Sequence, residues 1–291
     1  MPLLLRWKCG IIAFALLLSC AGCSTVRLTY NQGPTLAYWW LDTQLDLDAG
    51  QREPVQDAIG RWFDWHRATQ LPALADWLDD VQRLAADKVT PAQVCATWAT
   101  LQQRLLDWYD HVLPDLAAPA KTLTAAQIDH LAQRYAKDLK KLERDYVQPD
   151  PAERRKAQLE RTVERLENIY GELSVAQKRQ IAGALAESPF NAGRWVDERR
   201  QRQRDIVEML RRIAAERPDD AMTVALLRRL GEQAIASPRP AYRAHFERVM
   251  QSNCGFIATM HNGISDAQRR HALQTLRDWQ DDARALAARR D

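Results

Sequence analysis

Cysteine is the residue type with the clearest chemistry in this chain, and the position of Cys23 makes its thiol a candidate for acylation. Residues 10–18 form an apolar run of the length typical of a secretory leader, and two basic residues precede it. Ala21 and Gly22 supply the small side chains that signal peptidase II accepts before a lipidated cysteine. The sequence therefore predicts a signal peptide over residues 1–22, its removal, and a lipid on Cys23.

Other interpretations of the leader stay open. Cys20 ends a second lipobox-like segment, and a freely secreted chain or an uncleaved anchor would carry a similar apolar run. By the lipoprotein sorting rule, Ser24 in place of Asp directs a lipoprotein of a Gram-negative bacterium to the outer membrane. We therefore expect residues 23–33 to form a lipidated tether at the periplasmic face of that membrane. Residues 34–291 are then expected to form a single all-helical periplasmic domain.

Cys95 and Cys254 are the cysteines that remain once the leader and Cys23 are set aside. In an oxidising compartment such a pair is typical of a disulfide, although two buried free thiols would also fit the sequence. The bond would close a loop of about 160 residues and stabilise the fold by roughly 4–5 kcal/mol in the chain-entropy description. We expect the pair to be bonded.

Histidines and carboxylates could do acid–base or metal chemistry, but their spacing here indicates neither. The six histidines are scattered, and none forms an HExxH or HxxxH pair. No GxSxG, SxxK or glycine-rich phosphate motif is present, and the acidic residues near His111 are typical of a solvated helix face. The sequence predicts no catalytic residue, no metal site and no cofactor, and we expect no enzymatic activity.

Tryptophans are concentrated near the start of the domain, with seven of them within residues 39–108. Packing between helices is the ordinary role of these rings. Trp39 and Trp40 are adjacent, and Trp62 and Trp65 lie about one helical turn apart. If exposed, such pairs would be candidates to line a groove for a peptide, glycan or lipid, or to rest on the membrane interface near the tether.

The segment 194–212 carries seven arginines against four acidic residues. Arg194, Arg199 and Arg202 are candidates for an anion-binding face toward lipid headgroups or acidic partners. The alternative is a solvated helix face whose charges pair within the helix.

The elements that must position these residues are predicted to be helices. Glycine is scarce, and the pattern of an aliphatic residue, then Ser, Thr or Asp, two residues and Gln is the capping box of a helix N-terminus. Apolar residues recur at helical spacing after each box. We predict an all-α, irregular bundle of about nine to ten helices with short loops, with a helix break at Pro114–Pro119 and a helix start near Glu53, just before Pro54. The five boxes lie at residues 47–51, 89–93, 123–127, 173–177 and 264–268.

Two resemblances rest on these motifs. The run CSTVRLTYN at 23–31, with the WWLD run at 39–42 and the LDxxQ motif at 47–51, resembles the start of a family of uncharacterised proteobacterial lipoproteins, defined only as a domain of unknown function. That resemblance covers the whole chain and implies no activity. The LTxxQ motif at 123–127 is similar to that of the Spy and CpxP periplasmic stress proteins, small helical cradles that chaperone unfolded clients.

The charge balance narrows the class of partner. Without the leader, 39 basic residues face 38 acidic ones, so we expect no nucleic acid as a partner. We expect an outer-membrane-anchored lipoprotein with a non-enzymatic binding or envelope-structural role, whose partners are the membrane and other envelope proteins or peptide clients. A Spy-like chaperone is one alternative and requires an exposed apolar face. An enzyme acting on peptidoglycan is another and requires histidines or carboxylates that converge in one cleft.

Overall fold

The computed structural model describes residues 25–288, so the leader and Cys23 lie outside the described residues. Every regular element in that range is helical, and the elements are more numerous than the nine or ten helices expected. Part of the difference comes from residues 23–33, expected as a tether, where residues 25–31 are helical. The elements are α2 (Thr25–Asn31), α3 (Gly33–Leu45), α4 (Ala49–Trp65), the π-helix η1 (His66–Gln70), α5 (Leu71–Ala85), α6 (Pro91–Thr122), α7 (Ala125–Tyr146), α8 (Pro151–Tyr170), α9 (Val175–Glu187), α10 (Ala192–Glu216), α11 (Asp220–Ile235), α12 (Pro240–Asn262) and α13 (Asp266–Ala288).

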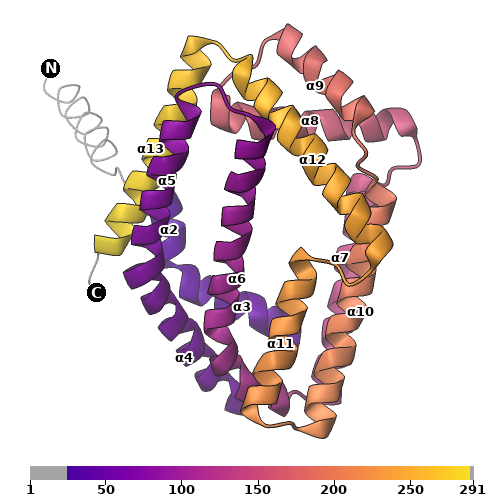
Figure 1. Ribbon diagram of the computed structural model, residues 1–291. Helices are drawn as coiled ribbons and strands as arrows, with labels where there is room; N and C mark the ends of the chain where they lie inside the picture. The colour runs from indigo at the N-terminus through magenta and orange to yellow at the C-terminus, as the bar shows by residue number, and fades with distance from the viewer. Residues whose placement is uncertain (1–24, 289–291) are drawn as a thin grey trace, which may run out of the picture.

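The helices are arranged as the sides of an open, roughly triangular frame (Figure 1). α5 and α13 run together along one side and make the most extensive helix pair, while α7 and α10 pair on another side. The long helix α6 runs through the middle and contacts α4, α10, α11 and α12. No helix of the described residues is both long enough and apolar enough to cross a bilayer.

The core is divided among the sides of this frame. The largest cluster of buried side chains joins α6, α7, α10 and α11 and includes Leu113, Ile128 and Ile213. A second cluster joins α8, α9, α12 and α13 around Ile181 and Met260. Smaller clusters join α5 to α13 and α3 to α4. Because the core consists of several separate clusters, some large apolar side chains between them, such as Trp98 and Trp279, remain exposed.

All five predicted capping boxes are present. At Thr124, for example, the hydroxyl accepts from the Gln127 amide, and the Gln127 side chain accepts from the Thr124 amide. The capping glutamines also bond to each other in pairs across the frame: Gln51 with Gln127, and Gln177 with Gln268. Each pair joins two helix starts that are far apart in sequence. The remaining boxes are formed at Asp48, Thr90, Ser174 and Ser265.

Two predictions drawn from prolines are wrong. α4 begins at Ala49 and not near Glu53, because the Asp48 carboxylate accepts from two amides of the first turn and fixes it ahead of Pro54. α6 runs unbroken through Pro114 and Pro119. Three residues of this proline-containing segment, Leu113, Ala117 and Ala120, are buried, and this burial offsets the cost of about 3 kcal/mol that an interior proline imposes.

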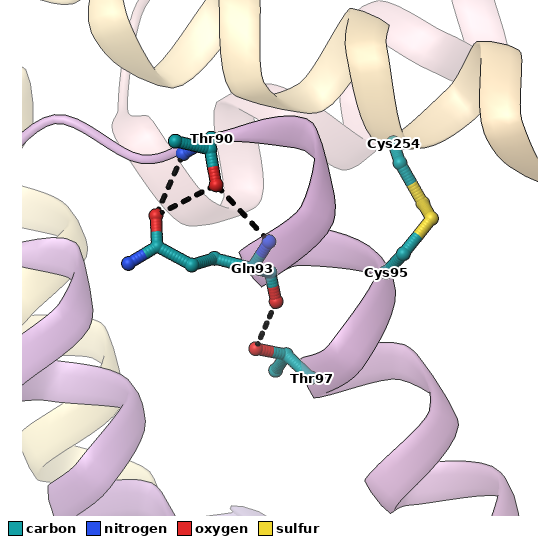
Figure 2. The surroundings of a disulfide bond; sticks show 5 residues. All are labelled: Thr90, Gln93, Cys95, Thr97 and Cys254. Atoms are coloured by element: carbon teal, nitrogen blue, oxygen red, sulfur yellow. Dashed lines mark hydrogen bonds between the residues drawn. A yellow bond between two sulfur atoms is a disulfide. The ribbon is translucent and has the colours of Figure 1, made fainter.

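The predicted cysteine pair is confirmed. Cys95 near the start of α6 and Cys254 in α12 lie at disulfide-bonding distance, with Cα atoms 5.5 Å apart. Figure 2 shows the pair beside the Thr90–Gln93 capping box, on the turn that follows it. Cys254 is buried, as its apolar stripe predicts. The bond therefore ties the first turns of α6 to the middle of α12.

Candidate ligand-binding groove

An apolar groove of about 390 Å³ lies where α5, α6, α12 and α13 meet, with the end of α8 at one side. Its volume is within the range of small-molecule sites. Two of its tryptophans, Trp98 and Trp279, are 39% and 43% exposed. The lining residues are Trp77, Val81, Leu84, Ala85, Val89, Val94, Thr97, Trp98, Leu101, Ile169, Tyr170, Ile257, His261, Ala272, Leu276 and Trp279.

The groove exists because the apolar stripe of α6 is longer than the surface that covers it. Residues 94, 98, 101, 105 and 108 recur at helical spacing and form one face. At the far end Trp108 packs against His66 of η1, whereas Trp98 and Leu105 remain exposed. The disulfide fixes α6 against α12 just above this stripe, so both walls are held at a set separation.

The polar atoms of Thr97, Tyr170 and His261 in the lining are already engaged. The Thr97 hydroxyl donates to the Gln93 carbonyl oxygen within α6, at 3.0 Å (Figure 2). The Tyr170 hydroxyl lies 3.3 Å from His261 Nδ1, and His261 Nε2 lies 3.0 Å from the Asp87 carbonyl oxygen. The polar groups of the wall that remain unengaged are the indole N–H donors of its tryptophans.

The lining is also neutral. Burial lowers the pKa of His261, and the charge of Arg269 lowers it further, against the opposing effect of backbone hydrogen bonds. Burial raises the pKa of Tyr170. Arg269 lies outside the lining and donates to the carbonyl oxygens of Ala85 and Asp87. Around neutral pH the wall thus carries no charge, which suits an aliphatic or aromatic ligand and not an ionic one.

The tryptophan candidates from the sequence fall into two groups. Trp39 and Trp40 on α3 are exposed, at 61% and 62%. Trp62 and Trp65 on α4 are half-buried in an aromatic cluster, where Trp62 stacks on His66 and Trp65 stacks on His111 at a centroid distance of 3.6 Å. The four residues therefore do not form one site, and the second pair has a packing role.

The arginine candidates on α10 do not converge either. Arg194 and Arg199 are exposed to solvent. Arg202 is half-buried, donates to the Ala234 carbonyl oxygen and lies 3.5 Å from the buried carboxylate of Glu198. Its charge is thus directed toward the protein.

Glu198 is instead held by a residue that the sequence did not single out. Arg239 donates to both Glu198 carboxylate oxygens, at 2.7 and 2.8 Å, and Ser237 donates to one of them. Burial would raise the pKa of Glu198, but these hydrogen bonds and the neighbouring arginine charges outweigh it and lower the pKa. This network ties the start of α12 to α10.

Residue types that bind metals are dispersed over the part of the chain that the structure describes. Within residues 25–288, no three His, Cys, Asp or Glu side chains are grouped so that they could hold a metal ion. The histidines whose pKa is lowered are His66, His245 and His261, and burial is the main cause at each. In the groove, the one imidazole of the lining, His261, lies beside the Tyr170 hydroxyl.

The sequence did not reveal the groove because its walls come from distant segments. Trp77 and Trp98 belong to the tryptophan-rich region of the sequence, but Trp279 lies far from it. The one signal that bears on it is the pair Cys95 and Cys254, which joins α6 to α12 beside the groove.

The fold and groove define an all-helical, disulfide-linked protein with a neutral binding groove. The chain belongs to a family of unknown function, DUF6279, whose match covers residues 43–230. That match ends in α11, so the α12 and α13 walls of the groove, with Cys254 and Trp279, lie beyond it. No curated protein and no solved structure matches the chain.

Proposed function

We propose that this chain is a lipid-anchored protein of the outer membrane of a Gram-negative bacterium, exposed to the periplasm, that binds an acyl chain in the groove. The observation that carries the binding role is the neutral, tryptophan-lined wall, whose unengaged polar groups are indole N–H donors alone. Cys23, Ser24 and the preceding apolar run support the anchor, as does the resemblance of the first residues to proteobacterial lipoproteins. The Cys95–Cys254 pair supports an oxidising compartment.

An acyl chain suits the groove better than a peptide does. A peptide backbone brings N–H and C=O groups whose burial costs free energy unless they find partners. The polar atoms of Thr97, Tyr170 and His261 already have partners, and the tryptophans of the lining offer indole N–H donors, which cannot pair with a peptide N–H. A hydrocarbon chain needs none.

The binding test is isothermal titration of the mature chain with palmitate. The double variant Trp98→Ser and Trp279→Ser removes two partly exposed rings from the wall, and we expect the affinity to fall by about tenfold or more because apolar contact area is lost. Leu105→Ser is the matched control, since Leu105 is exposed on the same helix but lies outside the lining. The absence of saturable binding by the parent, or equal affinity in all three proteins, would reject the proposal.

The anchor is tested separately. The chain is expressed in a Gram-negative host with an alkyne analogue of palmitate, and Cys23→Ala is expected to abolish labelling. Labelling that persists in Cys23→Ala would move the lipid to Cys20. Absence of label in the parent would contradict the anchor without bearing on the groove.

A chaperone role is the second candidate, and one observation favours it. Trp98 and the 45% exposed Leu105 continue the apolar face of α6 past the end of the groove, where the side chains of an unfolded client could pack. Suppression of aggregation of a reduced client protein should then weaken in Leu105→Ser. Loss of this activity in Leu105→Ser with palmitate binding intact would favour the chaperone.

A further inference from the structure

The outward face of α2 and α3 is exposed and carries no charge. Ten residues between Thr25 and Leu45 are exposed, and all are apolar, threonine or glutamine. Five are large apolar residues, with exposures from 45% to 62%. The ten are Thr25, Val26, Leu28, Thr29, Gln32, Thr35, Leu36, Trp39, Trp40 and Thr43. We call this set the α2–α3 face.

These side chains form a continuous stripe. The Gln32 amide donates to the Leu28 carbonyl oxygen and the Leu36 amide donates to that of Gln32, so helical bonding continues across the junction between α2 and α3. Positions 25, 28, 29, 32, 35, 36, 39, 40 and 43 follow the three- and four-residue spacing that keeps side chains on one side of a helix. The charged residues of the segment, Arg27 and Asp42, point elsewhere and interact with Asp282 and the Leu47 amide.

Such a surface is exceptional in this protein. Eight of the nine exposed residues of α10 are charged, which is the ordinary composition of a solvated helix. The α2–α3 face instead has the features of a membrane interface, where tryptophans lie at the headgroup level and leucines lie deeper. Ion pairing with a partner protein would require charges that this face lacks.

The short chain segment before α2 indicates that a lipid bilayer covers the α2–α3 face. Only Ser24 separates Cys23 from Thr25, and an extended chain spans at most about 3.6 Å per residue. A lipid on Cys23 therefore keeps the start of α2 within about 10 Å of the bilayer surface. α2 itself is held against α13 through Arg27 and Asp282, so the face cannot swing away without breaking that contact.

We infer that the α2–α3 face rests on the phospholipid bilayer and is a second attachment of the domain to the membrane besides the lipid. This inference rests on the proposed anchor for the position of the bilayer. A lipid on Cys23 holds one point of the chain at the bilayer, and a second contact is needed to fix the orientation of the domain. The α2–α3 face supplies that contact and fixes which side of the frame turns toward the membrane.

The test uses the mature chain, residues 23–291, with Cys23→Ser, so that the face is measured without the lipid. Flotation with vesicles of phosphatidylethanolamine and phosphatidylglycerol gives the partition coefficient. The triple variant Leu36→Ser, Trp39→Ser and Trp40→Ser should lower it by about tenfold or more, because three apolar side chains no longer enter the interface. Circular dichroism checks that all forms are helical.

The matched controls are exposed apolar residues on distant helices. Val175→Ser and Met222→Ser, at 71% and 53% exposure in the parent, should leave flotation unchanged. The groove variant Trp98→Ser and Trp279→Ser should also leave it unchanged, which separates this surface from the groove.

Two results would overturn the inference. One is equal flotation of the Cys23→Ser chain and its triple variant. The other is a dimer in solution that the triple variant dissociates, since the face would then be covered by a second copy. Absence of alkyne label on the parent chain would instead contradict the anchor. The vesicle result would still show whether the α2–α3 face binds a bilayer.

Discussion

The two tryptophan-rich regions of this protein, an aromatic cluster and the groove, differ in the hydrogen bonds that their indole N–H groups form. In the aromatic cluster, which we define as Tyr30, Trp62, Phe63, Trp65, His66, Trp108 and His111, the Trp62 indole N–H donates to the Trp108 carbonyl oxygen and that of Trp108 donates to Gln70, both at 2.9 Å. In the groove, the indoles of Trp77, Trp98 and Trp279 form no hydrogen bond with the described part of the chain. The comparison teaches that the cluster rings are fixed by hydrogen bonds at Trp62 and Trp108 and by stacking on His111 at Trp65, whereas the groove rings have neither contact and leave a surface available to a ligand.

The two regions also differ in the contacts between their aromatic rings. His66 is buried among Tyr30, Trp62 and Trp108, and its Nδ1 lies 2.8 Å from the Tyr30 hydroxyl. The cluster therefore joins α2, α4 and α6 through stacked and edge-to-face contacts. The groove rings line an open surface with no such pairing.

The largest effect is expected at the disulfide, which should separate the two regions. Reduction, or the double variant Cys95→Ser and Cys254→Ser, removes a link across 159 residues and should lower the free energy of unfolding by about 5 kcal/mol. Urea unfolding measures this loss. Palmitate binding should weaken because α6 and α12 are no longer tied, while the aromatic cluster keeps its near-ultraviolet dichroism. Loss of that dichroism in the folded variant would show that the aromatic cluster also depends on the disulfide, and would contradict the difference between the two regions.

Truncation of one tryptophan in each region gives the next largest effect. Trp62→Ala should cost about 3–5 kcal/mol of unfolding free energy, because it leaves a cavity and removes the hydrogen bond from the indole to the Trp108 carbonyl oxygen. Trp98→Ala should cost less than about 1 kcal/mol, because its ring is partly in solvent already. Thermal and urea unfolding measure the loss of unfolding free energy in both variants. Similar losses would contradict the claim that Trp62 is packed and Trp98 is not.

The contribution of His66 to the pH dependence of stability tests the aromatic cluster. Burial lowers the pKa of His66 from 6.5 to about 4, so the folded protein binds fewer protons there than the unfolded chain. The stability from the neutral ring is complete above about pH 6.5, and up to about 3 kcal/mol is lost as the pH falls to about 4. His66→Gln should flatten the profile of unfolding free energy in this window. An unchanged profile would show that another group causes it.

The smallest expected effects come from two hydroxyl deletions. Tyr30→Phe leaves His66 Nδ1 without its partner and should cost about 1 kcal/mol. Tyr170→Phe removes a longer contact, 3.3 Å, to His261 and should cost less than Tyr30→Phe. Urea unfolding measures both losses. Tyr170→Phe should leave the affinity for palmitate unchanged, and a large fall in that affinity would mean that the hydroxyl takes part in binding.

Much of the fold could be predicted from local sequence, and the groove could not. A capping box is a contact between residues three apart, so the Thr124 and Gln127 box was readable from its own pattern. The bond from Gln127 to Gln51 depends on two helix starts that meet only in the folded chain. Pro119 shows the reverse case, since its local preference predicts a break and the packing of α6 overrides it.

Among the candidate site residues, too, some could be predicted from the sequence and others could not. Cys95 and Cys254 were paired by counting, once the leader and Cys23 were assigned. Nothing local distinguishes Trp62 from Trp98, since both lie on amphipathic helices. Only the partner helices decide that Trp62 is packed and that Trp98 faces a groove.

The central claim is that the groove tryptophans, and not those of the aromatic cluster, contact the ligand. The most direct measurement is quenching of tryptophan fluorescence by a brominated fatty acid bound to the mature chain. We expect saturable quenching that is largely lost in the triple variant Trp77→Phe, Trp98→Phe and Trp279→Phe and retained in Trp62→Phe. Quenching that persists in the triple variant, or that is lost in Trp62→Phe, would contradict the claim.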